Sequence, residues 1–326
     1  MNELGKSRNG SEICETGSAA NTGAVRPDMS VEIAGVQFKN PVMTASGTFG
    51  SGMEYSEFVD LNKLGAVVTK GVANVPWEGN PTPRVAEVYG GMLNAIGLQN
   101  PGIDVFIERD LAFLKQFDTK VIVNVCGHTE EEYLEVVERL ADQPVDMLEI
   151  NVSCPNVKQG AIQFGQDPKC LCDITEKIKR VAGQPVIMKL TPNVTDIAQM
   201  ARAAEAGGAD AISLINTLMG MKIDVEKRKF VLANKTGGLS GPAIKPVAVR
   251  MVWQAAQAVR IPVIGMGGIA SAEDAVEFML AGASAVAVGA MNFHDPYLTQ
   301  KVVDGMEQYL IRHNISTARE LTGAVL

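Results

Sequence analysis

Residues 145–156, VDMLEINVSCPN, place a polar loop sequence directly after a short apolar run. The run from Val145 to Ile150 is too short for a helix and ends in polar residues, which predicts a buried strand. Pro155 lacks an amide donor and disfavours a helical conformation at Cys154, so the thiol is expected on a loop at the strand's carboxyl end. Buried cysteines are more often small hydrophobic residues of the core, and these residues alone would also suit a structural cysteine in a turn.

Composition narrows the class of protein. The chain has 326 residues, of which 46% are hydrophobic and 20% charged, which allows two domains or one α/β barrel. The net charge of -8 argues against a nucleic-acid partner. No apolar run is long enough to span a membrane, and the polar amino terminus lacks the hydrophobic core of a signal peptide. Five scattered cysteines suit a reducing compartment, so we expect a cytoplasmic protein.

The sequence changes character near residue 28. The first residues, to about Pro27, are rich in Ser, Gly, Asn and Glu and cannot bury enough surface to offset their ordering entropy. We expect a disordered extension at 1–28, a single barrel domain at 29–313 and a C-terminal tail at 314–326. Two short alternating runs, Val31–Ile33 and Val36–Phe38, flank Ala34-Gly35 and predict a small β hairpin at the amino-terminal side. Residues 296–313 have the pattern of a final amphipathic helix.

From residue 41 onward, an apolar strand, a polar end, a loop and an amphipathic helix recur, often with Gly after the helix as a C-cap. Eight strands are predicted: Pro41–Ala45, Ala66–Thr69, Val121–Val125, Met147–Ile150, Val186–Met188, Ala211–Ile215, Val263–Gly265 and Ala285–Val288. Strands alternating with helices imply parallel pairing, and eight units close a (β/α)8 TIM barrel of the α/β class. An open doubly wound sheet is the alternative, but residues 45–50 do not fit its dinucleotide fingerprint.

The carboxyl ends of these strands should meet at one face, where barrel enzymes carry their active sites. The residues there are Ser46, Lys70, Asn124, Asn151 with Cys154, Lys189, Asn216 with Thr217, Gly267-Gly268, and Gly289. A single Asn at a strand end is usually a turn residue, but the whole set predicts a site. Two long segments, 72–101 and 220–241, are expected to form functional loops or a small subdomain over this mouth.

Glycines predict an anion site within this face. The run Gly265-Met266-Gly267-Gly268-Ile269 follows the seventh strand and leads into a helix, where Ser271 and Asp274 resemble a capping box. Backbone N–H groups and a helix amino terminus favour negative charge, and Gly289 lies at the end of the neighbouring strand. Turns after strands seven and eight are the usual phosphate site of a barrel.

Lys189 and Cys154 carry the predicted reactivity. A lysine at a barrel mouth either forms a Schiff base or places positive charge beside a cofactor that gains negative charge, and Lys70 belongs to the same class. Cys154 is a candidate nucleophile or general base if its surroundings lower the pKa of the thiol. No histidine stands in a strand-end motif, and the spacing of Cys170 and Cys172 does not suit zinc, so we expect no metal site.

Several longer motifs resemble one family. They are NPTPR at 80–84, NAIGLQNPG at 94–102, NVSCPN at 151–156, KTGGLSG at 235–241 and GMGGI at 265–269. Over residues 29–313 the chain resembles dihydroorotate dehydrogenase, specifically the class 1B catalytic subunit of bacterial pyrimidine synthesis. Cysteine at 154, where membrane-bound relatives have serine, is similar to the soluble class 1 enzymes, and IGLQNPG resembles class 1B rather than the fumarate-linked class 1A.

The resemblance implies FMN in the barrel mouth. Its phosphate would be held by Gly267, Gly268, Gly289 and Ala290, although the family often has Thr at the last position. The rest of the flavin site would be Ser46, Lys70, Gly71, Asn124, Asn151, Lys189, Ile215 and Gly241. The substrate would be held by Lys70, Asn94, Ala95, Ile96, Gly97, Leu98, Asn151, Asn216 and Thr217. Carboxamides suit a pyrimidine edge because each can donate and accept hydrogen bonds.

The resemblance also implies the reaction and the partners. Cys154 would remove a proton from C5 of dihydroorotate while hydride leaves C6 for FMN, giving orotate. Class 1B enzymes pair with an electron-transfer subunit that carries FAD and a 2Fe–2S cluster and passes electrons to NAD, in a heterotetramer of two catalytic and two electron-transfer subunits. The alternative from the residues alone is a Schiff-base lyase of the aldolase type that uses Lys189.

Overall fold

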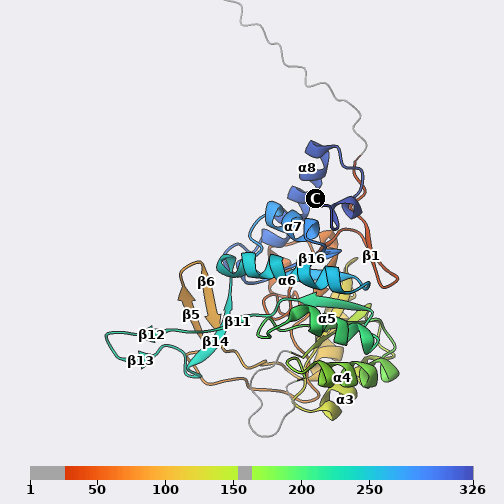
Figure 1. Cartoon of the computed structure of the whole chain (residues 1–326). Helices are drawn as coiled ribbons and strands as arrows, with labels where there is room; N and C mark the ends of the chain where they lie inside the picture. The colour runs from red at the N-terminus through yellow and green to blue at the C-terminus, as the bar shows by residue number, and fades with distance from the viewer. Residues whose placement is uncertain (1–25, 153–163, 326) are drawn as a thin grey trace, which may run out of the picture.

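The centre of the molecule is a closed barrel of eight parallel strands (Figure 1). A computed structural model describes residues 26–152 and 164–325. The barrel strands are β3 (Val42–Thr44), β4 (Ala66–Val68), β7 (Lys120–Val125), β8 (Met147–Asn151), β9 (Val186–Lys189), β10 (Ala211–Leu214), β15 (Val263–Met266) and β16 (Ala285–Val288). They pair in this order and close between β16 and β3. Each predicted strand agrees with one of these within one residue at either end, so the (β/α)8 prediction is confirmed.

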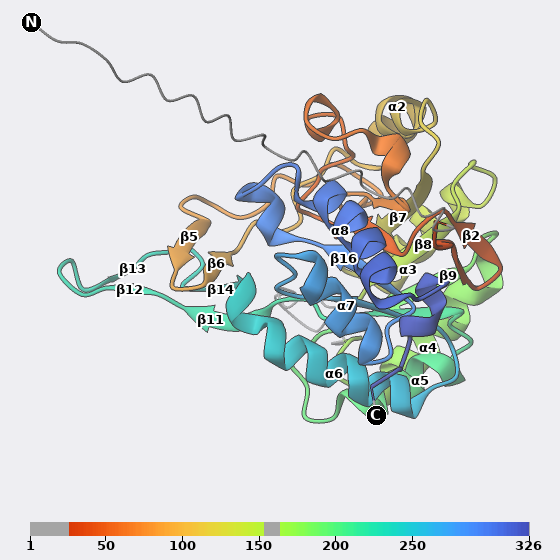
Figure 2. The same ribbon diagram turned by 90° about the horizontal axis from the view of Figure 1, so that it is seen from above.

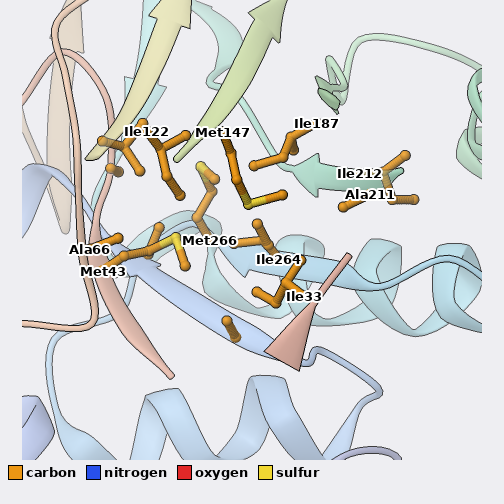
Figure 3. Packing of buried hydrophobic residues seen from close by; sticks show 14 of the residues in the cluster. Ile33, Met43, Ala66, Ile122, Met147, Ile187, Ala211, Ile212, Ile264 and Met266 are labelled. Carbon is orange, nitrogen blue, oxygen red and sulfur yellow. The ribbon is translucent and has the colours of Figure 1, made fainter. Parts of the chain in front are cut away.

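The strands form because their residues are apolar on both faces, one face toward the lumen and the other toward the helices. The residues of β3, β4, β8, β9, β10, β15 and β16 are all buried. Figure 3 shows Met43, Ile122, Met147 and Ile264 packed together in this core. Ile33 of the hairpin lies in the same cluster and is fully buried, so the hairpin is part of the barrel's core packing.

Helices cover the outside of the barrel, and those that follow one another along the chain lie side by side, as α7 and α8 do in Figure 2. The long helices are α3 (Glu130–Leu140), α4 (Pro168–Val181), α5 (Ile197–Ala206), α6 (Lys245–Ala258), α7 (Ala272–Leu280) and α8 (Leu298–His313). Shorter turns are η1 (Tyr55–Glu57), η2 (Leu61–Lys63), α1 (Ile103–Val105), η3 (Phe106–Leu111), α2 (Ala112–Leu114), η4 (Pro242–Ile244), η5 (Ala290–Phe293) and η6 (Ala318–Leu321). Side chains of Thr129, Asp167, Asp196 and Ser271 accept backbone N–H bonds and fix where α3, α4, α5 and α7 begin.

The two long segments over the mouth join in a second sheet. Strands β5 (Val85–Val88) and β6 (Gly91–Asn94) come from the first segment, and β11 (Leu218–Met221) and β14 (Thr236–Ser240) from the second. Their order is β11-β14-β6-β5, and a ribbon of β12 (Ile223–Asp224) and β13 (Lys229–Phe230) extends away from the barrel (Figure 1). The predicted subdomain therefore exists, and pairing between its two segments holds it together.

Both ends of the described chain are held against the barrel. The predicted hairpin is confirmed as β1 (Val31–Ile33) and β2 (Val36–Phe38), which pair antiparallel. The predicted tail packs its residues Ala318 and Leu321 into the core, and Asp28 exchanges backbone hydrogen bonds with Ser316 and Ala318. Residues 1–25 of the expected disordered extension lie outside the described residues.

Candidate active site

A cavity of about 380 Å³ opens at the carboxyl ends of the barrel strands and continues beneath the second sheet. Its wall includes every predicted cofactor residue: Ser46, Lys70, Gly71, Asn124, Asn151, Lys189, Ile215, Gly241, Gly267, Gly268, Gly289 and Ala290. It also includes the predicted substrate residues Asn94, Ala95, Ile96, Gly97, Leu98, Asn216 and Thr217. Cys154 lies outside the described residues. The structure thus brings the described candidates together, while their roles stay predictions.

Lys189 lies in a polar cluster on the cavity floor. Its Nζ is 2.9 Å from Ser46 Oγ and 3.4 Å from Glu149 Oε1, and both charged side chains are almost fully buried. Asn124 Nδ2 donates to the same Glu149 oxygen at 2.6 Å, and Ser213 Oγ donates to the other oxygen at 2.8 Å. The buried charges are therefore paired and hydrogen-bonded, as a low-dielectric interior requires.

Asn124 lines the cavity and has a buried acceptor next to Gly71. Its Nδ2 is taken by Glu149, and its Oδ1 is buried with no hydrogen-bond partner among residues 26–152 and 164–325. A Cβ placed on Gly71, which also lines the cavity, would lie 3.1 Å from that oxygen. A buried acceptor without a partner is unfavourable, so this wall is suited to a ligand that brings an N–H or O–H donor.

Lys70 supplies a second cation to the cavity. Burial lowers the pKa of its ammonium group below the ordinary 10.5. A negative charge on Cys126 would raise this pKa in part, whereas the positive charge of Arg84 also lowers it. Its Nζ lies beside Gly47, 3.9 Å from where a Cβ on that glycine would be. A partly desolvated ammonium is well suited to hold an anionic ligand group such as a carboxylate.

The opposite wall is made of backbone. Gly267 and Gly268 have φ values of 126° and 82°, which disfavour any other residue. A Cβ on Gly268 would approach Gly241 O to 2.8 Å and Lys245 N to 3.0 Å. The turn leads into α7, so backbone N–H groups and the helix amino terminus face the same region.

The predicted capping box at α7 forms only in part. Ser271 Oγ accepts from Asp274 N at 3.2 Å, as predicted. The Asp274 carboxylate, however, accepts from Ala270 N at 2.8 Å and also pairs with Lys245. Asp is one carbon shorter than the usual Glu, and here it binds the amide of the residue before the cap.

Asn80 shapes the loop over the cavity that contains Asn94–Leu98. Its Nδ2 donates to Ala95 O at 3.0 Å, and its backbone N donates to Ile96 O at 2.9 Å. Gly97 has a φ of 76°, and a Cβ there would meet the Asn80 side chain at 2.7 Å. Arg84 Nη2 donates to Gln99 Oε1 at 2.6 Å and fixes the far side of this loop.

Carboxamide side chains line the part of the wall that follows β8, β9 and β10. Asn216 Nδ2 lies 3.4 Å from Asn151 Oδ1, and the backbone oxygen of Asn151 accepts from Tyr133 Oη at 2.7 Å. Asn193, which sequence reasoning did not select, donates to Thr217 O at 3.0 Å and lines the cavity. This arrangement offers both donors and acceptors to a small polar ring.

Comparisons with known proteins agree with this geometry. A family model described as dihydroorotate dehydrogenase matches residues 28–310. The chain belongs to the dihydroorotate dehydrogenase family. Proteins named the catalytic subunit of dihydroorotate dehydrogenase B (NAD(+)) from Lachnoclostridium phytofermentans and Geotalea daltonii are 69% and 58% identical over 296 and 301 residues. The two alignments cover 91% and 92% of this chain and 99% of each relative.

The fold is also that of a solved member of the family. The dihydroorotate dehydrogenase of Eimeria tenella, in complex with ferulenol, superposes with a TM-score of 0.77 at 24% sequence identity. The alignment covers 93% of this chain and 90% of that one. At this identity the likeness establishes the shared barrel and no more.

The family is flavin-dependent, and the cavity fits a flavin. Asn124 Oδ1, which has no partner within the described ranges, suits a ring N–H donor, and the turn of Gly267 and Gly268 at the start of α7 suits a phosphate. By contrast, a Schiff base at Lys189 is disfavoured, because its Nζ is held by Ser46 Oγ and the buried Glu149 carboxylate instead of being free to approach a carbonyl.

Glu149 is the site residue that sequence reasoning missed. The available signal was a carboxylate inside an otherwise apolar strand, since a buried Glu is rare unless it is paired. Within the described ranges, no group of three or more His, Cys, Asp or Glu residues could hold a metal ion. None of the described helices is long and apolar enough to cross a membrane.

Proposed function

We propose that this chain is the class 1B catalytic subunit of an NAD-linked dihydroorotate dehydrogenase, which oxidises dihydroorotate to orotate in pyrimidine biosynthesis with FMN as its cofactor. The observation that carries the proposal is one cavity that combines a glycine turn at a helix start, an Asn124 acceptor with no partner among the described residues, the buried Lys189 and the partly buried Lys70. High identity to the named relatives along nearly their whole length supports the same assignment.

The glycine wall would hold the cofactor phosphate, through Gly267, Gly268, Gly289 and Ala290. Ala290 has no hydroxyl, so backbone N–H groups would carry these contacts. The cavity floor would hold the ring, through Ser46, Lys70, Gly71, Asn124, Asn151, Lys189, Ile215 and Gly241. When bound, FMN would accept the hydride that leaves C6 of dihydroorotate.

The chain's own residues would bind and deprotonate the substrate. Lys70 would pair with the substrate carboxylate, and Asn94–Leu98, Asn151, Asn216 and Thr217 would hold its ring amides. Cys154 would take the C5 proton onto Sγ as the C6 hydride departs, which leaves the C5–C6 double bond of orotate. Its place three residues after Asn151 in the sequence supports this role.

The electrons would leave through a partner. The relatives' name, catalytic subunit, implies a second subunit. We propose that this partner carries FAD and a 2Fe–2S cluster, that two copies of each chain form a heterotetramer, and that the complex works in the cytoplasm.

An absorbance spectrum of the purified chain, before and after anaerobic addition of dihydroorotate, tests the proposal. We expect a flavin spectrum that bleaches on addition. A protein that stays colourless after incubation with FMN would overturn the assignment, and borohydride trapping of substrate on Lys189 would then favour the aldolase alternative. A flavin spectrum that does not bleach would support the fold and the cofactor and leave the substrate open.

A further inference from the structure

We propose that Glu149 is a positioning residue, whose buried carboxylate fixes the orientation in which Asn124 and Lys189 face the cavity. This inference rests on the proposed function, because it assigns to Glu149 a part in binding FMN. Glu149 itself does not line the cavity; it acts through the two side chains that do.

The geometry places Glu149 at the meeting point of three donors. It lies in β8, is 1% exposed, and is the register partner of Asn124 on β7. Asn124 Nδ2 and Lys189 Nζ lie 2.6 and 3.4 Å from Oε1, while Ser213 Oγ lies 2.8 Å from Oε2. The donors come from β7, β9 and β10, so one carboxylate joins four strands of the barrel.

The carboxylate determines which end of the Asn124 amide faces the ligand. A carboxylate accepts hydrogen bonds and has none to donate, so Asn124 must turn its Nδ2 toward Glu149. Oδ1 then lies next to the cavity-lining Gly71, where it is buried and lacks a partner in the described part of the chain. Among the described residues, Glu149 is the acceptor that holds Asn124 Nδ2, so without it the amide could rotate and present a donor instead.

The same carboxylate holds the lysine. Lys189 is 4% exposed, and its Nζ lies between Ser46 Oγ and Glu149 Oε1. A long flexible side chain has many rotamers, and two fixed acceptors select the one seen here. Lys189 thus reaches the cavity floor at a defined position.

Substitutions at position 149 separate this role from simple packing. Glu149→Leu keeps a side chain of similar size and removes both acceptors. Glu149→Gln keeps an acceptor oxygen for Asn124 and Lys189, while its Nε2 can donate to Ser213, since a hydroxyl both donates and accepts. Positioning therefore predicts loss of function in the leucine variant and rescue in the glutamine variant.

The experiment titrates flavin-free wild-type and variant proteins with FMN and follows the quenching of flavin fluorescence. We expect Glu149→Leu to bind FMN about 10- to 100-fold more weakly and Glu149→Gln to stay within about 3-fold of the wild type. Thr44→Val is the matched control. It removes a buried hydroxyl of the barrel, which bonds to Val68, without touching the Glu149 cluster, so its FMN affinity should not change.

A double-mutant cycle locates the effect. Asn124→Leu should weaken FMN binding, and adding Glu149→Leu should cost much less than it does alone, because it acts partly through Asn124. If Glu149→Leu does not fold, Glu149→Met, which is unbranched and of similar length, takes its place.

Three results would overturn the inference. They are wild-type affinity in the leucine variant, an equal loss in the leucine and glutamine variants, or full additivity with Asn124→Leu. A wild-type chain that does not bind FMN would overturn the proposed function and this inference together, whereas the three results above leave the proposed function intact.

Discussion

The cavity wall that follows β7, β8 and β9 is built from side chains, whereas the wall that follows β15 and β16 is built from backbone. On the first wall, Asn124, Asn151 and Lys189 are oriented by buried hydrogen bonds. On the second, Gly267 and Gly268 have positive φ values, and a Cβ on either would meet neighbouring atoms at 2.8 Å.

The difference corresponds to two kinds of ligand group. A planar heterocycle is recognised by donors and acceptors at fixed positions, which side chains provide. A phosphate is recognised by converging N–H groups and a helix dipole, which need close approach of the main chain. Changes on the side-chain wall should therefore affect binding of the ring as well as the chemistry, and changes on the backbone wall should affect binding of the phosphate.

The largest expected effect concerns Cys154, which follows Asn151 of the side-chain wall by three residues in the sequence. Cys154→Ser should slow flavin reduction by dihydroorotate about 100- to 10,000-fold at neutral pH, because serine is a much weaker base. Anaerobic stopped-flow absorbance measures this rate. Cys170→Ser and Cys126→Ser are the controls and should react at near the wild-type rate. A near-normal rate in Cys154→Ser would remove Cys154 as the base.

The next effect tests the backbone wall with a pair of glycines. Gly268→Ala should weaken FMN binding about 100-fold, because strain at its φ of 82° adds to the close approach of Gly241 O and Lys245 N. Gly289→Ala should bind within a few-fold of wild type, since among the described residues its Cβ would meet only Ala45 Cβ, at an ordinary 3.4 Å. Fluorescence titration of the two flavin-free variants compares them directly, and equal affinities would contradict the steric argument.

A smaller effect concerns the pH dependence of ligand binding at Lys70. Burial lowers the pKa of Lys70 below 10.5, so its ammonium charge is lost at a lower pH than for an exposed lysine. Orotate affinity should be constant below the Lys70 pKa and fall by about 10-fold as the charge is lost at higher pH. Titration calorimetry across this range measures the change.

Lys70→Arg is the control, because a guanidinium keeps its charge throughout. Any protonation change of orotate itself contributes equally to the pH profiles of both proteins. Only the difference between the two profiles therefore reports on Lys70. Identical pH profiles for the two proteins would show that the Lys70 charge does not contribute to orotate binding.

Local signals located the strands and the strand-end part of the wall, whereas Gly71, Asn94–Leu98, Ile215, Gly241 and Ala290 were predicted from the family resemblance. Buried parallel strands appear as short apolar runs, and their polar ends mark the mouth. The pairing of β6 with β14 could not be predicted in this way: it joins Asn94 to Gly238, which are 144 residues apart. Glu149 was missed because its partners come from three other strands and meet only when the barrel closes.

The smallest expected effect lies behind the side-chain wall, at Tyr133. Its hydroxyl donates to the backbone oxygen of Asn151 at 2.7 Å, and Tyr133→Phe removes this bond while keeping the ring that packs on Phe164. The free energy of unfolding should fall by about 1 kcal/mol, measured by urea denaturation of the flavin-free protein. Tyr297→Phe changes an exposed hydroxyl and should leave stability unchanged. Orotate affinity should fall by no more than a few-fold in Tyr133→Phe, because the pairing of β8 with β9 still holds the backbone of Asn151. A larger loss of affinity would mean that Tyr133, and not β8, fixes the position of the Asn151 carboxamide.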